Sequence, residues 1–415
     1  MNSIESLYRH EYGHLVAILT QRVGVQHLVL IQDSVQQAIE KAILKWTPNT
    51  TPSNPTGWLY LTAFRFFLSE QRTSKQKNHL LAQNPIFTDN QIEKLEEPPL
   101  KKELSDSLLR MLFLSCDDKI PAESQLVFTL KSLCGFSISA IATRLLISEE
   151  NAYKRYGRAK LFLKQQHTSA SILHNEPQPS RLASVLRVLY VLFTEGYLSS
   201  HPETAIRKDL CFEAIRLALL LSKSEWGNTP ECTALIALMY FNIARIQARH
   251  DTLGLVLLAD QDRSTWDQSS IYKALEYLNL STKGNSISRY HVEAGIAATH
   301  CISPSFAATK WENIVKAYEL LAQIAPSPLH TLNHAIATAE YRGAGAALIL
   351  LKATNPPHWL SCSYHWYAVM SDLQYRNVQI SEARENAAKA LERTNSVHIE
   401  KLLHLRFERY EQALR

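Results

Sequence analysis

The chain has 415 residues, a net charge of +5 and a hydrophobic content of 46%. That hydrophobic content supports packed cores and excludes a wholly disordered chain. No apolar stretch reaches the roughly 18 residues of a membrane span, and the first residues lack the basic and then apolar layout of a signal peptide. Without a membrane span or a signal peptide, we expect a protein located in the cytoplasm. The chain has only 12 glycines, and this scarcity favours helices over tight turns, so we expect an all-α protein.

In the first 80 residues, two helices are predicted. Apolar residues recur at helical spacing over residues 31–46, and Pro48 ends that helix because the residue before a proline avoids helical angles. Pro55 stands at a favourable first position for the second helix, over residues 56–77. An acidic stretch with three prolines follows and is expected to be a linker.

Residues 125–166 carry the strongest local signal. Helices are predicted over residues 125–133, 139–145 and 151–166, and Ser148 is a good N-cap for the third. The third helix is basic, and two helices joined by a short turn, the second of them basic, form the helix-turn-helix layout. This arrangement predicts DNA binding.

Basic residues crowd the third of these helices. Asn151, Lys154, Arg155 and Arg158 lie three or four residues apart, so they share one face. Arginine bonds guanine, asparagine bonds adenine, and lysine or arginine pairs with phosphate. The predicted DNA-binding residues of this helix are Asn151, Lys154, Arg155, Arg158, Lys160 and Lys164. A solvated helix face is the alternative for any basic helix.

From residue 181 onward the pattern is helix after helix, interrupted by prolines. Ala346 and Ala353 recur at the same spacing as Ala383 and Ala390, at a distance close to the ~34-residue tetratricopeptide period. Repeated helical hairpins are one alternative and an ordinary helical bundle is the other. We expect two small helical domains, the second a helix-turn-helix, and a large α-helical C-terminal domain. The expected bounds are residues 1–80, a linker at 81–105, residues 106–167, a linker at 168–180, and residues 181–415.

Region by region, the chain resembles the extracytoplasmic-function (ECF) sigma factors of bacteria, in the group with a long, tetratricopeptide-like C-terminal extension. The match is carried by Gln32-Asp33-Ser34-Val35-Gln36-Gln37-Ala38 and Asn54-Pro55-x-x-Trp58-Leu59 in the first domain, and by Arg155-x-x-Arg158-Ala159-Lys160 in the helix-turn-helix. The most specific segment is the octapeptide Asp260-Gln261-Asp262-Arg263-Ser264-x-Trp266-Asp267.

The resemblance implies a transcription initiation factor without covalent chemistry. The helix that matches the family's clamp helix would bind core RNA polymerase through Asp33, Gln36, Gln37 and Lys41. The next helix would face promoter DNA with Trp58, Arg65, Arg72 and Lys75. The helix-turn-helix would bind the upstream promoter element. The C-terminal extension would regulate the protein's activity by contacting the first domain or a protein partner. The resemblance implies no membrane partner.

Two departures from the family pattern leave an alternative open. After Ala63 the family usually has Arg-Asn and later an Asp, in positions that face the promoter, whereas this chain has Phe64, Arg65 and Ser69. Gln37 stands where an acid is usual. The alternative is a degenerate sigma-like protein that acts as a protein-interaction scaffold without opening promoters.

Possible metal and carboxylate sites were weighed against structural explanations. His10 and His14 fit the H-E-x-x-H pattern of zinc proteases, but Gly13 weakens a helix and the chain has 16 histidines. We therefore expect no metal, no cofactor and no catalytic residue, and a zinc protease is the third alternative.

The six cysteines form no C-x-x-C pair, so reduced, mostly buried thiols are expected. His291, His300 and Cys301 are expected to be core or groove residues. The charged side chains of the octapeptide are expected to form an ion-pair network that joins helices.

Overall fold

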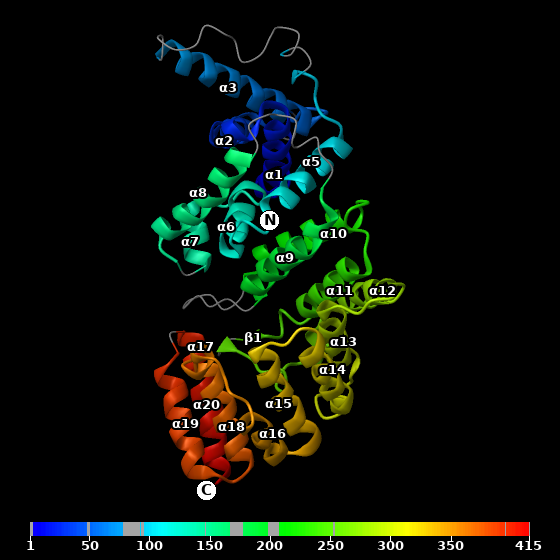
Figure 1. The fold of residues 1–415 in the computed structure, drawn as a ribbon, viewed down its shortest axis with the longest axis vertical. Helices are drawn as coiled ribbons and strands as arrows, with labels where there is room; N and C mark the ends of the chain where they lie inside the picture. Colours follow the sequence, from blue (N-terminus) through cyan, green and yellow to red (C-terminus); the bar gives the residue numbers. More distant parts are fainter. Residues whose placement is uncertain are drawn as a thin grey trace. The chain divides into compact units, whose positions relative to one another are not determined.

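The computed structural model describes residues 3–47, 50–77, 92, 95–145, 147–166, 177–197, 207–251, 254–394 and 396–414. The chain divides into two compact units, Met1–Val191 and Leu192–Arg415. Figure 1 shows that helices make up nearly all of each unit, which confirms the all-α prediction. In the described part, the strands are the antiparallel two-residue pair β1 (His250–Asp251) and β2 (Gly254–Leu255). No helix among the described residues is long and apolar enough to cross a membrane.

Five helices of the first unit were predicted from the sequence, and their ends differ by a few residues: α2 (Leu28–Lys45), α3 (Pro55–Lys77), α6 (Ala122–Ser132), α7 (Ile138–Leu145) and α8 (Glu149–Gln166). The structure adds α1 (Ser3–Val23), η1 (Val25–His27), α5 (Lys101–Ser115) and η3 (Pro179–Arg181). The last, α9 (Leu182–Tyr197), continues into the second unit. Trp46, two residues before Pro48, is extended, so α2 ends close to where the sequence predicts its end.

Buried polar contacts hold the helix-turn-helix against the N-terminal helices. Gln32 of α2 is buried, donates to the Ser132 hydroxyl over 3.1 Å and accepts from the Tyr156 hydroxyl over 3.0 Å. These bonds join α2 to α6 and α8, which lie close together in Figure 1. On α1, a Cβ at Gly13 would overlap the Leu133 carbonyl oxygen. Gly13 therefore permits a close helix approach, which gives the glycine of the H-E-x-x-H pentapeptide a structural reason.

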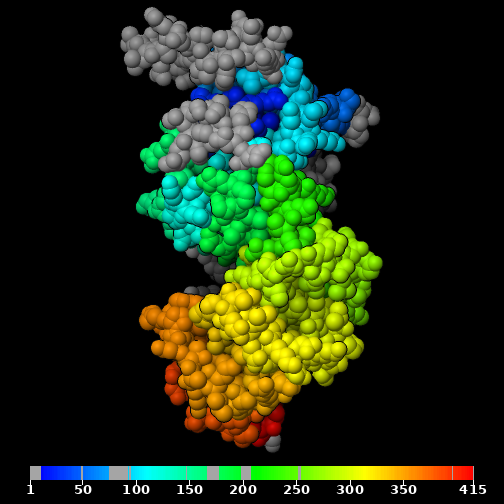
Figure 2. Space-filling model, turned by 45° about the vertical axis from the view of Figure 1, so that its right-hand side comes forward, coloured from blue at the N-terminus to red at the C-terminus, as the bar shows by residue number. Residues whose placement is uncertain are grey.

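The second unit is a succession of helices in which most pack against the next, while α16 packs against α18. They are α10 (Lys208–Ser222), α11 (Pro230–Ala244), η4 (Arg263–Thr265), α12 (Gln268–Ser281), α13 (Arg289–Ile302), α14 (Trp311–Ile324), α15 (Pro328–Arg342), α16 (Ala344–Lys352), α17 (His358–Ser361), α18 (Tyr364–Arg376), α19 (Ile380–Glu392) and α20 (Val397–Ala413). Figure 2 shows the yellow and orange helices from α13 onward side by side on one face of this unit.

Two sequence expectations about small side chains have different outcomes. All six cysteines are free and four are buried, as expected, and burial raises the pKa of Cys116, Cys211 and Cys232 to about 12. The two alanine pairs are not equivalent. Ala383 and Ala390 are fully buried, but Ala346 is half-buried and Ala353 is exposed. These pairs therefore do not mark equivalent positions of a repeat.

Candidate nucleic-acid interface

Local signals determine the shape of the helix-turn-helix. Gly135 has a φ of +74°, a conformation that favours glycine, and it turns the chain after α6. The Ser137 hydroxyl accepts from the Ala140 N–H over 3.0 Å and caps α7. The Ser148 hydroxyl accepts from the Asn151 N–H over 3.2 Å, which confirms its predicted role as N-cap of α8. Glu149 and Glu150 occupy the first turn, where negative charge is favourable.

The two sides of α8 differ sharply in burial. Its inner side is formed by the buried residues Ala152, Tyr156, Ala159 and Leu163, and the Tyr156 ring stacks on Phe128 of α6 at 5.7 Å. Burial raises the pKa of the Tyr156 hydroxyl, and its hydrogen bonds with Ser132 and Gln32 partly offset this rise. This side anchors the helix, so the opposite side is available to solvent.

The six predicted DNA-binding residues of α8 all lie outside that buried side. Lys154, Arg158 and Lys164 are exposed, and Asn151, Arg155 and Lys160 are half-buried. The Lys160 ammonium lies 5.9 Å from the Tyr156 ring centroid. Lys154 pairs with Glu150 over 2.6 Å, a contact that the sequence analysis did not predict. Both side chains of this pair are more than two-thirds exposed, so water weakens it and the lysine can change partner at little cost.

On α3, the predicted DNA-facing residues are distributed less uniformly. Arg65 and Arg72 are exposed, and the side chain of Lys75 lies outside the described residues. Trp58 is half-buried and packs edge-on against Trp46, with 5.2 Å between ring centroids. Phe64 is fully buried and stacks with Tyr60 and Phe67. The expectation that position 64 faces the promoter is therefore corrected, because the phase of α3 turns this aromatic side chain into the core.

Along α2, polar residues and apolar residues share the outer face. Asp33 and Gln36 are exposed, whereas Gln37 and Lys41 are half-buried, with the Lys41 ammonium 5.3 Å from the Phe66 ring centroid. The exposed apolar residues Val29, Ile43 and Leu44 were not predicted, and Leu44 is 85% exposed. Ile43 follows the buried Ile39 by one helical turn but is 44% exposed.

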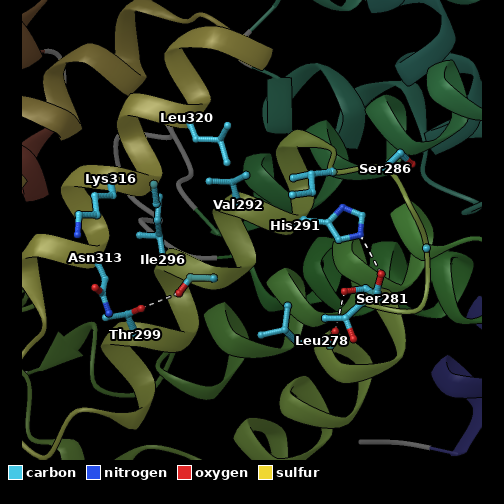
Figure 3. Close-up of a pocket in the computed structure, with 15 residues that line it drawn as sticks. Leu278, Ser281, Ser286, His291, Val292, Ile296, Thr299, Asn313, Lys316 and Leu320 are labelled. Carbon is cyan, nitrogen blue, oxygen red and sulfur yellow. Dashed lines mark hydrogen bonds between the residues drawn. The ribbon is translucent and has the colours of Figure 1, made fainter.

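A cavity of about 670 Å³ lies among α12, α13 and α14 of the second unit (Figure 3). Apolar side chains, including Leu278, Val292, Ile296 and Leu320, form most of its wall. His291 lies at its rim and is held by the Ser281 carbonyl oxygen, 3.2 Å from Nε2, and by Ser288, so it is a groove residue as expected. The size and lining suit a mainly apolar compound. In the described part of the chain, no group of three His, Cys, Asp or Glu side chains is placed to hold a metal ion.

Comparisons with known proteins bear on both units. Residues 110–163, which include α6, α7 and most of α8, match the family model of Sigma-70, region 4. Residues 181–282 match a family of unknown function, DUF6596. An uncharacterized protein of Rhizobium meliloti (strain 1021) is 29% identical over 91% of this chain and 90% of its own length. No solved structure matches the chain. The region 4 match supports a relation to sigma factors and a sigma-factor-like, DNA-binding role for the helix-turn-helix.

Proposed function

We propose that this protein is a sigma factor of the ECF type, which directs RNA polymerase to specific promoters and carries a regulatory helical C-terminal domain. One observation carries the proposal. In a segment similar to Sigma-70 region 4, α8 is anchored by its buried side and turns Lys154, Arg158 and Lys164 toward solvent. A purely structural helix gains nothing from this crowding of like charge, whereas a DNA-binding helix gains counterion release for each phosphate that it neutralises.

Promoter recognition is divided along α8. Its N-terminal end enters the major groove, so Asn151, Lys154 and Arg155 lie nearest the bases. Arg158, Lys160 and Lys164 lie closer to phosphates. The exposed Arg65 and Arg72 of α3 contact the promoter in the same complex. The Lys154–Glu150 pair opens on binding, since both of its side chains are already well hydrated.

The polymerase-binding surface is the outer face of α2. Val29, Asp33, Gln36, Glu40 and Leu44 follow one another at spacings of three or four residues and are all exposed. Exposed apolar side chains beside polar ones are typical of a protein-binding surface. Gln37 and Lys41 border this face. The second unit acts as the regulatory domain.

The test is promoter binding by the polymerase holoenzyme assembled with variants of the full chain. Arg155→Ala should cost about 1–3 kcal/mol of promoter affinity and relax base preference at one position. Lys164→Ala should weaken binding to all sequences and reduce the salt slope by about one. Lys102→Ala is the matched control, because Lys102 is an exposed lysine on α5 outside the region 4 match.

Two outcomes separate the sigma factor from the scaffold alternative. If neither α8 variant changes promoter affinity or its salt dependence, the basic helix is a solvated face and the scaffold replaces the sigma factor. If the α8 variants lose affinity but the wild-type holoenzyme yields no run-off transcript, the protein binds promoters without opening them. In that case the departures at Arg65 and Ser69, both exposed on α3, are the residues to restore.

A further inference from the structure

The acids of the octapeptide do not pair with its arginine. Asp260 forms an ion pair with Arg409 of α20 over 2.9 Å. Asp262 caps η4 through the Ser264 N–H, and Asp267 caps α12 through the Ser269 N–H. The expected ion-pair network is therefore limited to Asp260, because Asp262 and Asp267 serve as helix caps.

Arg263 instead lies beside the ring of Trp266 together with a second arginine. Its Nη1 donates to the carbonyl oxygens of His300 and Ser303, over 2.6 and 2.8 Å, at the end of α13. The Arg263 guanidinium carbon is 4.5 Å from the Trp266 ring centroid, and that of Arg245 is 5.8 Å from it. Trp266 is only 3% exposed. Two positive charges thus lie close to one buried indole.

Several buried polar atoms of this cluster have no hydrogen-bond partner in the described part of the chain. Among the described residues, the buried Nη2 of Arg263, Nε of Arg245 and Nε1 of Trp266 have no hydrogen-bond partner, nor does Nδ1 of His300. Arg245 uses its Nη2 for the Tyr197 hydroxyl and the Asn242 amide oxygen, both uncharged. Within the described chain, neither arginine forms an ion pair with an acid. The cluster therefore combines uncompensated positive charge with donors that lack acceptors.

The electrostatics of neighbouring groups agree with this geometry. The pKa of His300 is lowered to about 3, first by burial and then by the charges of Arg245 and Arg263. The pKa of Arg263 is also lowered, by burial and by the charge of Arg245. Groups around the cluster thus experience a positive potential that no described acid offsets.

We propose that Arg245, Arg263 and Trp266 form a binding site for a small phosphate-bearing anion. Both arginines are half-buried, and each of their buried donor atoms without an acceptor costs about 1–3 kcal/mol. Two guanidinium groups match the charge of about −1.5 to −2 that a phosphate monoester carries near neutral pH, which a single carboxylate does not. Guanidinium groups also suit phosphate geometry. Because Trp266 is buried, the ligand is a small molecule and not the backbone of a nucleic acid.

Thermal unfolding and calorimetric titration of the full chain test the site. The probes are inorganic phosphate and glycerol phosphate, compared with acetate at the same ionic strength and pH. A ligand that binds the folded state raises its melting temperature. Whichever of the two phosphate probes binds with the higher affinity shows whether the site prefers the free anion or a phosphate monoester. Acetate should have little effect, since it carries one charge.

Three variants and one control locate the binding. Arg245→Gln and Arg263→Gln should each weaken phosphate binding about tenfold or more, the loss expected for a charge-assisted hydrogen bond. Trp266→Phe keeps an aromatic ring but removes the indole N–H donor, so it should weaken phosphate binding several-fold. This variant remains informative if an arginine variant fails to fold. Arg409→Gln removes an exposed guanidinium that pairs with Asp260 and should bind phosphate normally.

Three results would overturn the site. In the first, neither phosphate probe stabilises the wild type more than acetate does. In the second, both arginine variants bind phosphate as tightly as Arg409→Gln. In the third, the arginine variants fail to fold, Trp266→Phe folds, and its affinity for phosphate equals that of the wild type. In each case ordered water would be the partner of the donors.

Discussion

On α8, the cations Lys154, Arg158 and Lys164 face water, and Lys154 has an exposed acid beside it. In the second unit, Arg245 and Arg263 lie against a buried indole, where no acid of the described chain pairs with them. Water and salt screen the first group, so its interactions with the rest of the fold contribute little to stability. The second group is half-buried against the buried Trp266, so water and salt screen it less and its contacts contribute more to stability. The same side-chain chemistry therefore predicts large mutational effects in one region and small effects in the other.

Trp266 should show the largest effect. Trp266→Ala removes the ring beside which both guanidinium groups lie and leaves a cavity, so it should destabilise the second unit by about 3–5 kcal/mol. Denaturant unfolding measures this change. The control is Tyr153→Ala on α8, because Tyr153 is an aromatic residue with 59% exposure and should lose far less. Equal losses in the two variants would remove the contrast between the regions.

His300 should make stability depend on pH. Its pKa in the folded protein is about 3, against an ordinary value of 6.5. As pH falls below 6.5, the unfolded chain takes up a proton that the folded chain refuses, so stability is lost between about pH 6.5 and 3, by about 1.4 kcal/mol per pH unit. His300→Gln should remove this part of the slope when unfolding is measured in phosphate-free buffer.

The matched control is His404→Gln, since His404 is half exposed on α20. The slope of this variant should equal that of the wild type. A wild-type slope that persists in His300→Gln would show that His300 is protonated as readily as a histidine in water.

Local signals explain why the helix-turn-helix was predicted well from the sequence. Gly135, the Ser148 cap and the apolar spacing of α8 all act within a few residues along the chain. The burial of Phe64 was missed because it depends on which face of α3 packs against the other helices. Comparing one position with a family pattern does not reveal which face that is. The Trp266 cluster was missed for a stronger reason. Arg245, Arg263 and His300 come from separate elements, and only the fold brings them together.

The octapeptide illustrates the opposite error. Adjacent acids and an arginine in sequence indicated mutual ion pairs, but Asp262 and Asp267 bind backbone N–H groups at the starts of η4 and α12. An aspartate that caps a helix satisfies donors that would otherwise have no partner, and this role competes with a side-chain ion pair. Sequence proximity of opposite charges is therefore a weak predictor where a helix begins.

Ser148→Ala tests a solvated interaction of intermediate size. It removes the N-cap of α8 and should cost about 1 kcal/mol of stability in the first unit. The same change should weaken promoter binding, because Asn151 lies in the first turn of α8, which Ser148 caps. Ser139→Ala is the control, since Ser139 is exposed inside α7. An unfolding curve of Ser148→Ala that matches that of Ser139→Ala would mean that the cap contributes nothing.

Glu150→Gln should have the smallest effect on stability and addresses the exposed face of α8 directly. It breaks the Lys154–Glu150 pair, whose side chains are 68% and 76% exposed, so unfolding should change by no more than about 0.5 kcal/mol. Promoter binding should tighten, because an acid leaves the DNA-facing end and Lys154 needs no change of partner. The matched control is Glu312→Gln, which breaks an exposed pair with Lys316 at the same spacing in the second unit and should leave promoter affinity unchanged. Weaker promoter binding by Glu150→Gln would mean that the pair positions Lys154 for DNA, and that this salt bridge is part of the recognition surface instead of a solvated contact beside it.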